Sequence, residues 1–531
     1  MQKNNEMNKE LLIRSSSDNI DFALLKDKKL IEFHKDSNNT KFLVGDIYLA
    51  KIRKIMPALN AAFINVGYKK DAFLHYHDLR TSDHPGLTAI ANQGSKILPL
   101  FIYDQKNLRR LGGASKWWLN YALLRLISEY KNLGHSLQLV KDDTLNVIQD
   151  LVTSNKESDV SFHISYDPDP KHRNLVKQIR DLGFDLKIYN SNYFFETGTV
   201  LNQQGNPYQV FTPFYKALKQ RVDEWLSECE TLDNAYDFSD YQIYNSVDLA
   251  QLELLPNNDW DSGMQNYWEP PRTAKWYWKR FLNHVENYGS LRDIPGKFGT
   301  SHLSPYLAWG ELSTRQLYAS LQRRSLLDKS EQWVRQLVWR EFSANLLHHF
   351  PHLVDRPLRP EFERFPTRQQ REDYDSWKQG KTGFPIVDAG MRQLWSTGWM
   401  HNRVRMITAS FLVKQLLLPW QWGAEWFEDT LVDFDLSNNL MGWQWSAGCG
   451  ADAAPYFRIF NPLLQSKKFD KDGSYIREWI PALKDLKGGL VHEPEKAGLI
   501  SSKLDYPDPM LDLKETRQRA LDAYQQMREL R

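Results

Sequence analysis

Residues 433–462 read DFDLSNNLMGWQWSAGCGADAAPYFRIFNP, and this stretch decides the character of the C-terminal half of the chain. It combines acidic residues, paired asparagines, a Trp-Gln-Trp triplet and an arginine between aromatic residues. Large aromatic side chains, amides and charges around a Gly-rich turn suit a flat, polar, redox-active cofactor such as a flavin. The stretch therefore predicts a cofactor site in this part of the chain.

The composition is that of a large and nearly neutral chain. Its 531 residues are enough for two or three domains. Lys and Arg number 68 and Asp and Glu number 66, so no overall field draws the chain to nucleic acid, and DNA binding requires a local patch. The 19 tryptophans fit a large core, but their clustering after residue 330 favours a cofactor or stacking role for some of them.

The two cysteines, Cys229 and Cys449, lie far apart and show no metal-ligand spacing. We therefore expect no disulfide framework, no metal site and a reducing, cytoplasmic location. No apolar run approaches membrane-spanning length, and the first ten residues lack the apolar segment of a signal peptide. The sequence predicts no membrane contact.

Between residues 78 and 217 the hydrophobic pattern alternates between strands and helices. Residues 97–103, ILPLFIY, form a continuous apolar run, which is typical of a strand covered on both faces. Residues 116–131 read as an amphipathic helix, and HSLQLV, DVSFHISY and FDLKIYN read as further strands. This alternation predicts a doubly wound α/β domain with a parallel sheet, and the lack of a GxGxxG motif argues against ordinary dinucleotide binding there.

The segments around these motifs resemble the photolyase/cryptochrome family, and in particular a class I-like deoxyribodipyrimidine photolyase, from about residue 78 to 531. The resemblance implies an α/β antenna domain at 78–217, an interdomain linker at 218–273 and an all-α FAD-binding domain at 274–531. It implies light-dependent splitting of cyclobutane pyrimidine dimers by electron transfer from reduced FAD. It also implies damaged DNA as the partner, a folate or deazaflavin as a second, antenna chromophore, and a monomer.

A phosphate-binding turn is expected in LRDIPGKFGTSHLSPYLAWGELS, residues 291–313. Its hydroxyls and free backbone N–H groups could hold a pyrophosphate, although a plain helix cap is the alternative for such a Ser/Thr turn. In the resembled family the matching positions bind the flavin. The full set of cofactor-binding residues that the resemblance implies is Tyr288, Thr300, Ser301, Leu303, Ser304, Trp333, Arg340, Trp399, Asn402, Arg405, Asp433, Asp435 and Asn439. Arg405 should pair with Asp433.

The same resemblance implies an electron relay with Trp443 nearest the flavin and Trp420 next outward, while Asn439 lies against the central flavin nitrogen. Core packing is the alternative for such tryptophans. The outermost relay tryptophan is missing, because Thr367 stands at its position. Either Trp377 or Tyr374 substitutes for it, or light-driven reduction of the oxidised flavin is poor.

The residues expected to contact DNA and the lesion are Gln336, Trp339, Asn402, Arg403, Met406, Trp445 and Arg458. Several of them recur at helical spacing, for which a core stripe or a solvated helix face is the alternative. Gln336 departs from the family, where glutamate is usual and helps to stabilise the radical anion of the damaged pyrimidine. Glutamine keeps the hydrogen bond but cannot donate a proton in the same way. Gln336 and Thr367 leave open a cryptochrome-type photoreceptor, which would bind flavin without repairing DNA.

Residues 1–77 form a different segment with short strands and polar turns. VGDIYLAKIRKIMPALNAAFINVGYKKDAFLH, residues 44–75, resembles the RNA-binding barrel of ribonuclease E/G proteins, with Phe63 and Phe73 at base-stacking positions. This predicts a partial OB-type barrel that lacks its final strand, and RNA binding as a third alternative function. The family's first central strand is missing at the junction, so we expect residues 72–77 to take its place in the parallel sheet.

Overall fold

The computed structural model describes residues 9–15, 19–26, 29–37, 51–56, 61–65, 70–154, 160–221, 237–239, 241–270, 272–453 and 458–529. Before Asp71 only the backbone is described. In these residues, no helix is both long enough and apolar enough for a membrane crossing.

A five-stranded parallel sheet organises the first half of the fold. Its strands are β6 (Lys70–His75), β7 (Lys96–Ile102), β8 (Gln138–Val140), β9 (Val160–Ser165) and β10 (Leu186–Tyr189), in the order β10-β9-β6-β7-β8. β6 is the central strand and pairs in parallel with β7 and β9. The expectation that residues 72–77 supply the missing strand is confirmed, although the strand begins at Lys70 and ends at His75.

Helices cover both faces of this sheet, as the alternating pattern predicts. The helices are α1 (Pro85–Asn92), α2 (Gly113–Asn132), α3 (Thr144–Ser154) and α4 (Pro170–Asp181). In β6, Phe73 packs in one apolar cluster with α1 and α2, whereas Ala72 and Leu74 pack in another with α3 and α4. Successive side chains of a strand point to opposite faces, which gives the doubly wound arrangement.

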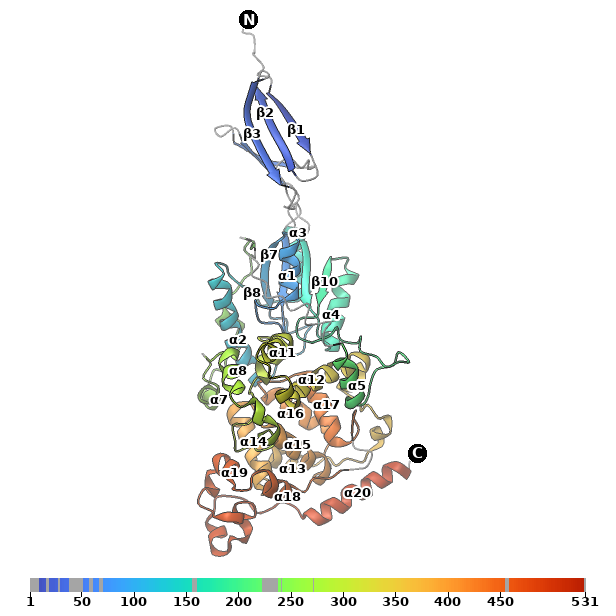
Figure 1. The fold of residues 1–531 in the computed structure, drawn as a ribbon. Coiled ribbons are helices and arrows are strands. Elements are labelled where there is room, and N and C mark those ends of the chain that lie inside the picture. Colours follow the sequence, from blue (N-terminus) through green and yellow to red (C-terminus); the bar gives the residue numbers. More distant parts are fainter. Residues whose placement is uncertain are drawn as a thin grey trace.

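The second half of the fold is helical and packs against the sheet unit (Figure 1). The apolar cluster on the α1 and α2 side of the sheet continues without a break into these helices, and Trp118 of α2 contacts the rings of Trp268 and Tyr306. The helices are α5 (Phe211–Lys219), α7 (Ser262–Trp268), α8 (Ala274–Leu282), α9 (Tyr288–Leu291), α10 (Ser304–Ala308), α11 (Thr314–Arg323), α12 (Glu331–His349), α13 (Arg371–Lys378), α14 (Pro385–Thr397), α15 (Asn402–Ser410), α16 (Trp420–Thr430), α17 (Leu436–Ala447), α18 (Pro462–Phe469), α19 (Ser474–Trp479) and α20 (Leu513–Glu529).

Short helical turns join them. One is a π-helical turn, η8 (Phe411–Gln415), which continues α15. The others are 3-10 turns: η2 (Leu249–Leu252), η3 (Asp259–Asp261), η4 (Val285–Asn287), η5 (Asp328–Ser330), η6 (Pro351–Val354), η7 (Pro360–Arg364), η9 (Pro481–Leu483), η10 (Gly488–Val491) and η11 (Pro494–Lys503).

The N-terminal strands form two further sheets. β1 (Lys9–Ser15), β2 (Asn19–Lys26) and β3 (Lys29–Ser37) make an antiparallel sheet, and β4 (Lys51–Met56) pairs with β5 (Ala61–Asn65). Among the described strands, no pairing joins these two sheets.

Phe73 corrects one expectation for this segment. Its side chain is fully buried in the α/β core, where the backbone of α1 approaches it closely at Gly86. Phe73 therefore cannot offer a face to a nucleic-acid base. The side chain of Phe63, the other aromatic residue expected to stack on RNA, lies outside the described residues.

Candidate active site

Helix α17 forms the centre of the segment 433–462. Asp435 caps its N-terminus by accepting a hydrogen bond from the Asn438 N–H at 2.9 Å. Trp443, on the same helix, is buried against α16, where Gly423 has no side chain and leaves room for the indole. The side-chain amide of Asn439 donates to the Ala424 carbonyl of α16 at 3.0 Å, which orients its oxygen as the acceptor end. α16 thus fixes two of the predicted residues.

The predicted ion pair between Arg405 and Asp433 is confirmed. A terminal guanidinium nitrogen of Arg405 lies 2.8 and 3.0 Å from the two carboxylate oxygens of Asp433. Nε of Arg405 also donates to the Met400 carbonyl, so the guanidinium is held from two sides. A charged pair at the start of α17 can tune a cofactor without either charge being left unpaired.

Arg340 of α12 is buried, like Trp333 on the same helix. Its guanidinium donates to the carbonyls of Asn192 and Leu307 and lies 3.8 Å from the Asp435 carboxylate. Arg340 therefore joins the sheet unit, α10 and the start of α17. Its role toward a cofactor stays a prediction.

The residues of the predicted phosphate-binding turn come together ahead of α10. The Ser301 hydroxyl accepts from the Leu303 N–H at 3.4 Å, and the Trp399 indole donates to the Ser304 hydroxyl at 3.3 Å. Ser304 is exposed, and Thr300 lies half-buried beside it. This donor set of hydroxyls and an exposed turn suits a pyrophosphate.

The ring of Phe281 contacts both Tyr288 and Trp333, with ring centres 5.9 and 5.4 Å apart. Both side chains are buried, and the Arg292 guanidinium lies 5.5 Å from the Tyr288 ring centre. The structure therefore groups α8, α9 and α12 around these two predicted cofactor residues.

His302 is a site residue that the sequence analysis missed. Its ring is stacked between Phe298 and Trp399, with ring centres at 4.7 and 4.6 Å, and its backbone is left-handed with φ of 54°. Burial lowers the pKa of His302 to about 4, so the imidazole is neutral at pH 7. No sequence signal marks this position, because its partners come from separate segments.

The residues predicted to face the lesion are partly exposed. Trp339 of α12 is half-buried, with one face stacked on Phe211 at 3.6 Å between ring centres. Met406 of α15, Trp445 of α17 and Arg458 line one small pocket. One face of Trp339 is thus supported by protein while the ring stays accessible, and Trp445 makes a T-shaped contact with Phe460 at 6.5 Å between ring centres.

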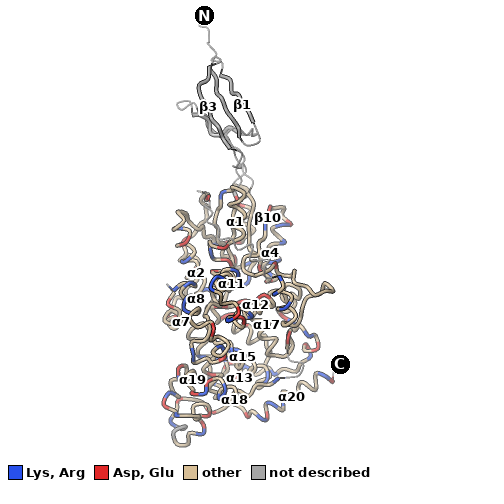
Figure 2. Tube along the Cα trace, viewed as in Figure 1, with Lys and Arg blue, Asp and Glu red and all other residues tan. Residues whose placement is uncertain are grey.

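The polar residues that are predicted to face the lesion are accessible to solvent. Gln336 is half-buried, and its amide accepts from Arg292 at 3.5 Å. Arg403 forms an ion pair with Asp293 at 2.8 Å, and Asn402 is exposed at the start of α15. Figure 2 shows basic and acidic residues interspersed over the described chain, so any DNA contact rests on local groups such as these.

The predicted relay tryptophans differ in their surroundings. Trp443 contacts the rings of Phe427 and Trp377, with ring centres at 5.0 and 6.1 Å. Trp420 is buried at the first turn of α16 but, within the described part of the chain, makes no ring contact with another aromatic residue. Thr367 lines an open groove beside Leu417 and α20.

A cavity lies where the carboxyl ends of the parallel strands meet the helices. It has a free volume of about 1130 Å³, open solvent included, and its aromatic walls include Tyr76, Tyr103, Tyr193, Trp309 and Phe434. His172 lines it and is buried, and neither of its ring nitrogens has a hydrogen-bond partner among the described residues. The carboxyl edge of a doubly wound sheet is the usual ligand position in such folds.

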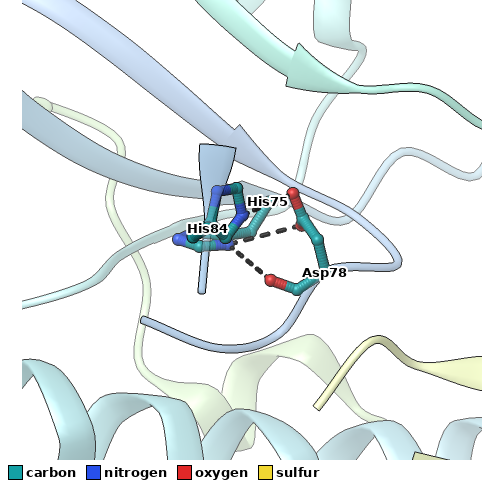
Figure 3. Close-up of side chains that lie close together, drawn as sticks. All are labelled: His75, Asp78 and His84. Carbon is teal, nitrogen blue, oxygen red and sulfur yellow. Dashed lines mark hydrogen bonds and ion pairs between the residues drawn. The ribbon is translucent and has the colours of Figure 1, made fainter. Parts of the chain in front are cut away.

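Three buried residues near the end of β6 could hold a metal ion: His75, Asp78 and His84 (Figure 3). Their donor atoms lie within 4.8 Å of one another. The protein already provides partners, however, because one Asp78 oxygen accepts from His84 and Ser165 at 2.9 and 2.5 Å, and His75 bonds to the Tyr130 hydroxyl at 2.7 Å. We interpret the group as an internal hydrogen-bond network.

The protonation states of the residues in this network follow from their burial and their hydrogen bonds. Burial opposes the charge on Asp78, but hydrogen bonds from His75 and His84 outweigh it and hold the Asp78 pKa well below its usual range. Burial lowers the pKa of His84 to about 4. The network thus holds an ionised carboxylate beside a neutral imidazole at pH 7.

Comparison with known proteins identifies the family. The family model for the FAD binding domain of DNA photolyase matches residues 333–526, and that for DNA photolyase matches residues 72–232. A deoxyribodipyrimidine photo-lyase from Agrobacterium fabrum is 38% identical over 464 residues, which cover 84% of this chain and 96% of the relative. The chain belongs to the photolyase/cryptochrome family.

Solved and curated members of the photolyase/cryptochrome family agree with the fold. A bacterial class III photolyase from Agrobacterium tumefaciens superposes with a TM-score of 0.81 at 36% identity, covering 88% of this chain and 99% of that one. Cryptochrome-2 from Arabidopsis thaliana is 31% identical, covering 87% of this chain and 79% of the relative. The predicted α/β and helical architecture is confirmed.

The photolyase match begins at residue 72, within β6, so residues 72–77 belong to the photolyase domain and not to a ribonuclease-like segment. The division of the chain at residues 77, 217 and 273 stays a prediction, as does the class I-like assignment.

Proposed function

We propose that this protein splits cyclobutane pyrimidine dimers in DNA in a light-dependent reaction with FAD. When bound, reduced FAD supplies one electron to the dimer after absorbing blue or near-ultraviolet light, and the electron returns once the ring has split. One observation carries the proposal: α12, α15 and α17 each bear residues of both predicted sets. The pairs are Arg340 and Trp339, Arg405 and Met406, and Asn439 and Trp445. A helix that carries both sets brings cofactor and lesion close together.

The chain's own residues hold the cofactor. Thr300, Ser301 and Ser304 provide hydroxyls for the pyrophosphate, and Arg405 remains paired with Asp433 beside the ring system. Asn439 presents an amide oxygen that can accept a hydrogen bond from a ring N–H, because its amide nitrogen already donates to the Ala424 carbonyl. The donor set therefore fits FAD, as the matching FAD-binding family model also indicates.

The substrate is a pyrimidine dimer turned out of the duplex. Trp339 and Trp445 stack against it, since both rings are partly exposed and each contacts a phenylalanine ring of the protein. Gln336, Asn402 and Arg403 hydrogen-bond to the lesion, and Arg458 meets a backbone phosphate. The exposed Asn402 and Arg458 and the half-buried Gln336 and Arg403 support these roles.

A cryptochrome-type photoreceptor is the second candidate. It is favoured by Gln336, which replaces the usual glutamate, and by the similarity to a plant cryptochrome. The partly exposed Trp339 and Trp445 favour repair, because a photoreceptor has no need of a lesion-stacking surface. The two functions share the cofactor and differ in what the excited cofactor acts on.

An antenna chromophore would occupy the cavity at the carboxyl edge of the sheet. Its aromatic walls suit a flat conjugated ring, and the unpartnered nitrogens of His172 offer a hydrogen bond to a heteroatom of that ring. A folate and a deazaflavin both have this chemistry. The absorption spectrum of the purified protein distinguishes them.

The decisive experiment irradiates the FAD-loaded full chain, with the flavin chemically reduced, in the presence of single-stranded DNA that contains thymine dimers. We expect the dimers to disappear in light and to persist in the dark. Trp339→Ala should keep its flavin and repair more slowly, whereas the surface variant Trp395→Ala should match the unaltered protein. A colourless protein that takes up no flavin would overturn the proposal. Flavin-loaded protein that leaves dimers intact in light would favour the photoreceptor instead.

A further inference from the structure

A basic surface lies on helix α8, outside the residues assigned to the cofactor and the lesion. The helix has a buried side, which includes Tyr277 and Phe281. Its sequence, AKWYWKRFL, contains no acidic residue. The exposed side chains of the helix are Lys275, Trp276, Lys279 and Arg280. The solvent side of α8 is therefore positively charged.

The turn that carries Lys297 and Phe298 completes this surface. Both side chains are exposed, and the Arg280 guanidinium lies 3.5 Å from the Phe298 ring centre. The same guanidinium lies 5.3 Å from the Trp276 ring centre. We define the α8 patch as Lys275, Trp276, Lys279, Arg280, Lys297 and Phe298.

Arg280 is held in place without using its hydrogen-bond donors. Its guanidinium lies over the ring of Phe298, which is itself stacked on His302 at 4.7 Å between ring centres. Among the described residues, no acceptor takes a hydrogen bond from the Arg280 side chain and no carboxylate pairs with it. A guanidinium that is oriented by aromatic rings keeps its planar set of N–H donors for a phosphate.

The lysines of the α8 patch are also without ion pairs in the part of the chain that the structure describes. Lys275 and Lys279 are four residues apart on one helix, so their like charges repel and destabilise the helix by about 0.2–0.5 kcal/mol. A local cost of this kind is typical of a functional surface. An anion that binds to both lysines would remove the repulsion.

The acidic side chains around the α8 patch do not neutralise it. Glu269 is paired with Arg272 at 2.6 Å. Hydrogen bonds from Ser474, and less so the charge of Lys297, lower the pKa of Asp472, which forms no ion pair among the described residues. Asp472 thus offsets a part of the charge, and the α8 patch stays positive.

The α8 patch adjoins the residues that are predicted to hold the damaged strand. Asp293 is paired with Arg403 at 2.8 Å, and Lys297 follows Asp293 by four residues. Four residues span at most about 14 Å, which corresponds to about four nucleotides of one DNA strand. A strand that leaves the lesion site toward α8 would therefore reach the patch within a few nucleotides.

We propose that the α8 patch binds the phosphates of the damaged strand on one side of the lesion. The inference rests on the DNA substrate of the proposed function and extends its contact surface beyond the lesion. Lys275, Lys279 and Lys297 neutralise phosphates, and Arg280 presents its N–H edge to another one. Because phosphate contacts carry no sequence information, the patch positions flanking DNA of any sequence.

The test measures binding in the dark of the FAD-loaded full chain to single-stranded oligonucleotides by fluorescence anisotropy. One oligonucleotide has about two nucleotides on each side of a thymine dimer, and two others extend either the 5′ or the 3′ side to about ten nucleotides. The variant combines Lys275→Gln, Lys279→Gln and Lys297→Gln, which leaves the ring contacts of Arg280 in place. The matched control combines Lys131→Gln, Lys171→Gln and Lys177→Gln, which are exposed lysines of the sheet unit.

The variant should bind one of the two extended oligonucleotides at least about tenfold more weakly at low salt. For that oligonucleotide, the slope of log affinity against log salt should fall by about two. Affinity for the short oligonucleotide should change by less than about twofold, because its strand ends before the α8 patch. The control should match the unaltered chain, and urea unfolding should show that the variant is no less stable, since the repulsion in α8 is removed.

Weakening for the short oligonucleotide, or for both extended ones alike, would overturn the proposal, because the lysines would then act through overall charge. Unchanged affinity for all three would also overturn it, and an acidic protein surface would then be the partner that fits the charge. Failure of the proposed function is recognised separately, by irradiating the unaltered chain with dimer-containing DNA. A chain that shows the length-dependent loss but leaves dimers intact in light keeps this inference and is not a repair enzyme.

Discussion

The sheet unit and the helical unit use the same polar residue types in opposite ways. In the sheet unit, Asp78 and Arg80 are almost fully buried, and Arg80 donates to the carbonyls of Ser191 and Gly310. In the helical unit, Arg403 and Arg405 keep part of their surface, and Asn402 and Arg458 are exposed. Buried polar groups whose partners are internal serve the fold, whereas those left accessible are available to a ligand.

The largest effect is expected from the loss of a buried arginine of the sheet unit. Arg80→Ala removes hydrogen bonds to Asn192 and to the carbonyls of Ser191 and Gly310, which tie the sheet unit to the helical unit. We expect the free energy of unfolding to fall by about 3–5 kcal/mol, because the partners remain buried and unpaired. Urea unfolding followed by circular dichroism measures the change.

Arg403→Ala is the control, because Arg403 is one of the accessible arginines of the helical unit. Its partner Asp293 is partly exposed, so the loss of stability should be below about 1 kcal/mol. Equal losses in the two variants would remove the distinction between buried and accessible arginines.

The second effect is a dependence of stability on pH that comes from the buried network. Burial lowers the pKa of His84 from 6.5 to about 4, so between these values the unfolded chain binds a proton that the folded chain does not. Stability is therefore present above pH 6.5 and is lost as the pH falls toward 4, by about 3 kcal/mol from this residue. Free energies of unfolding at pH 7 and 4.5 measure the loss, and His84→Asn should reduce it. An unchanged dependence of stability on pH in this variant would assign the loss to other groups.

The third effect tests whether the accessible aromatic surface serves DNA. Trp339→Ala should weaken dark binding of dimer-containing DNA by about 1–3 kcal/mol, the contribution of one stacked base. Fluorescence anisotropy with a labelled oligonucleotide measures the affinity. Trp395→Ala removes a more exposed tryptophan outside the site and should leave the affinity unchanged. If both variants weakened binding alike, exposure of tryptophan alone would account for it.

The smallest effect concerns salt. Arg458→Ala should weaken binding equally for damaged and undamaged DNA and lower the slope of log affinity against log salt by about one. Arg180→Ala, an exposed arginine at the end of α4 in the sheet unit, should leave the slope as it is. A titration from low to high salt separates them, and identical slopes for Arg458→Ala and the unaltered chain would contradict a phosphate contact.

Local patterns in the sequence were sufficient to predict the parallel sheet, the ion pair of Arg405 with Asp433 and the strand that replaces the family's first one. Each depends on a short run of residues, on a strong charge pair or on a motif of the family. The position of Phe73 was predicted wrongly, because the same alternation suits a barrel strand and the centre of a parallel sheet. What decides between them is the partner strand, and β7 and β9 come later in the chain.

Contacts between distant segments could not be predicted. The stacking of His302 on Trp399 and the bond from Ser165 to Asp78 each join residues from separate elements. No spacing rule in one sequence reports such pairs, because they depend on how the elements pack. The buried network therefore became visible only in the folded chain.

The direction of β6 has a practical consequence. The strand starts at Lys70 on the amino edge of the sheet, and the cavity lies beyond its other end, next to Tyr76 and His77. Whatever precedes the strand is thus attached on the side of the molecule that faces away from the cofactors. A fluorescent reporter or an affinity handle fused ahead of Lys70 would leave illumination and nucleic-acid access unobstructed, which makes this junction the place to begin engineering the protein.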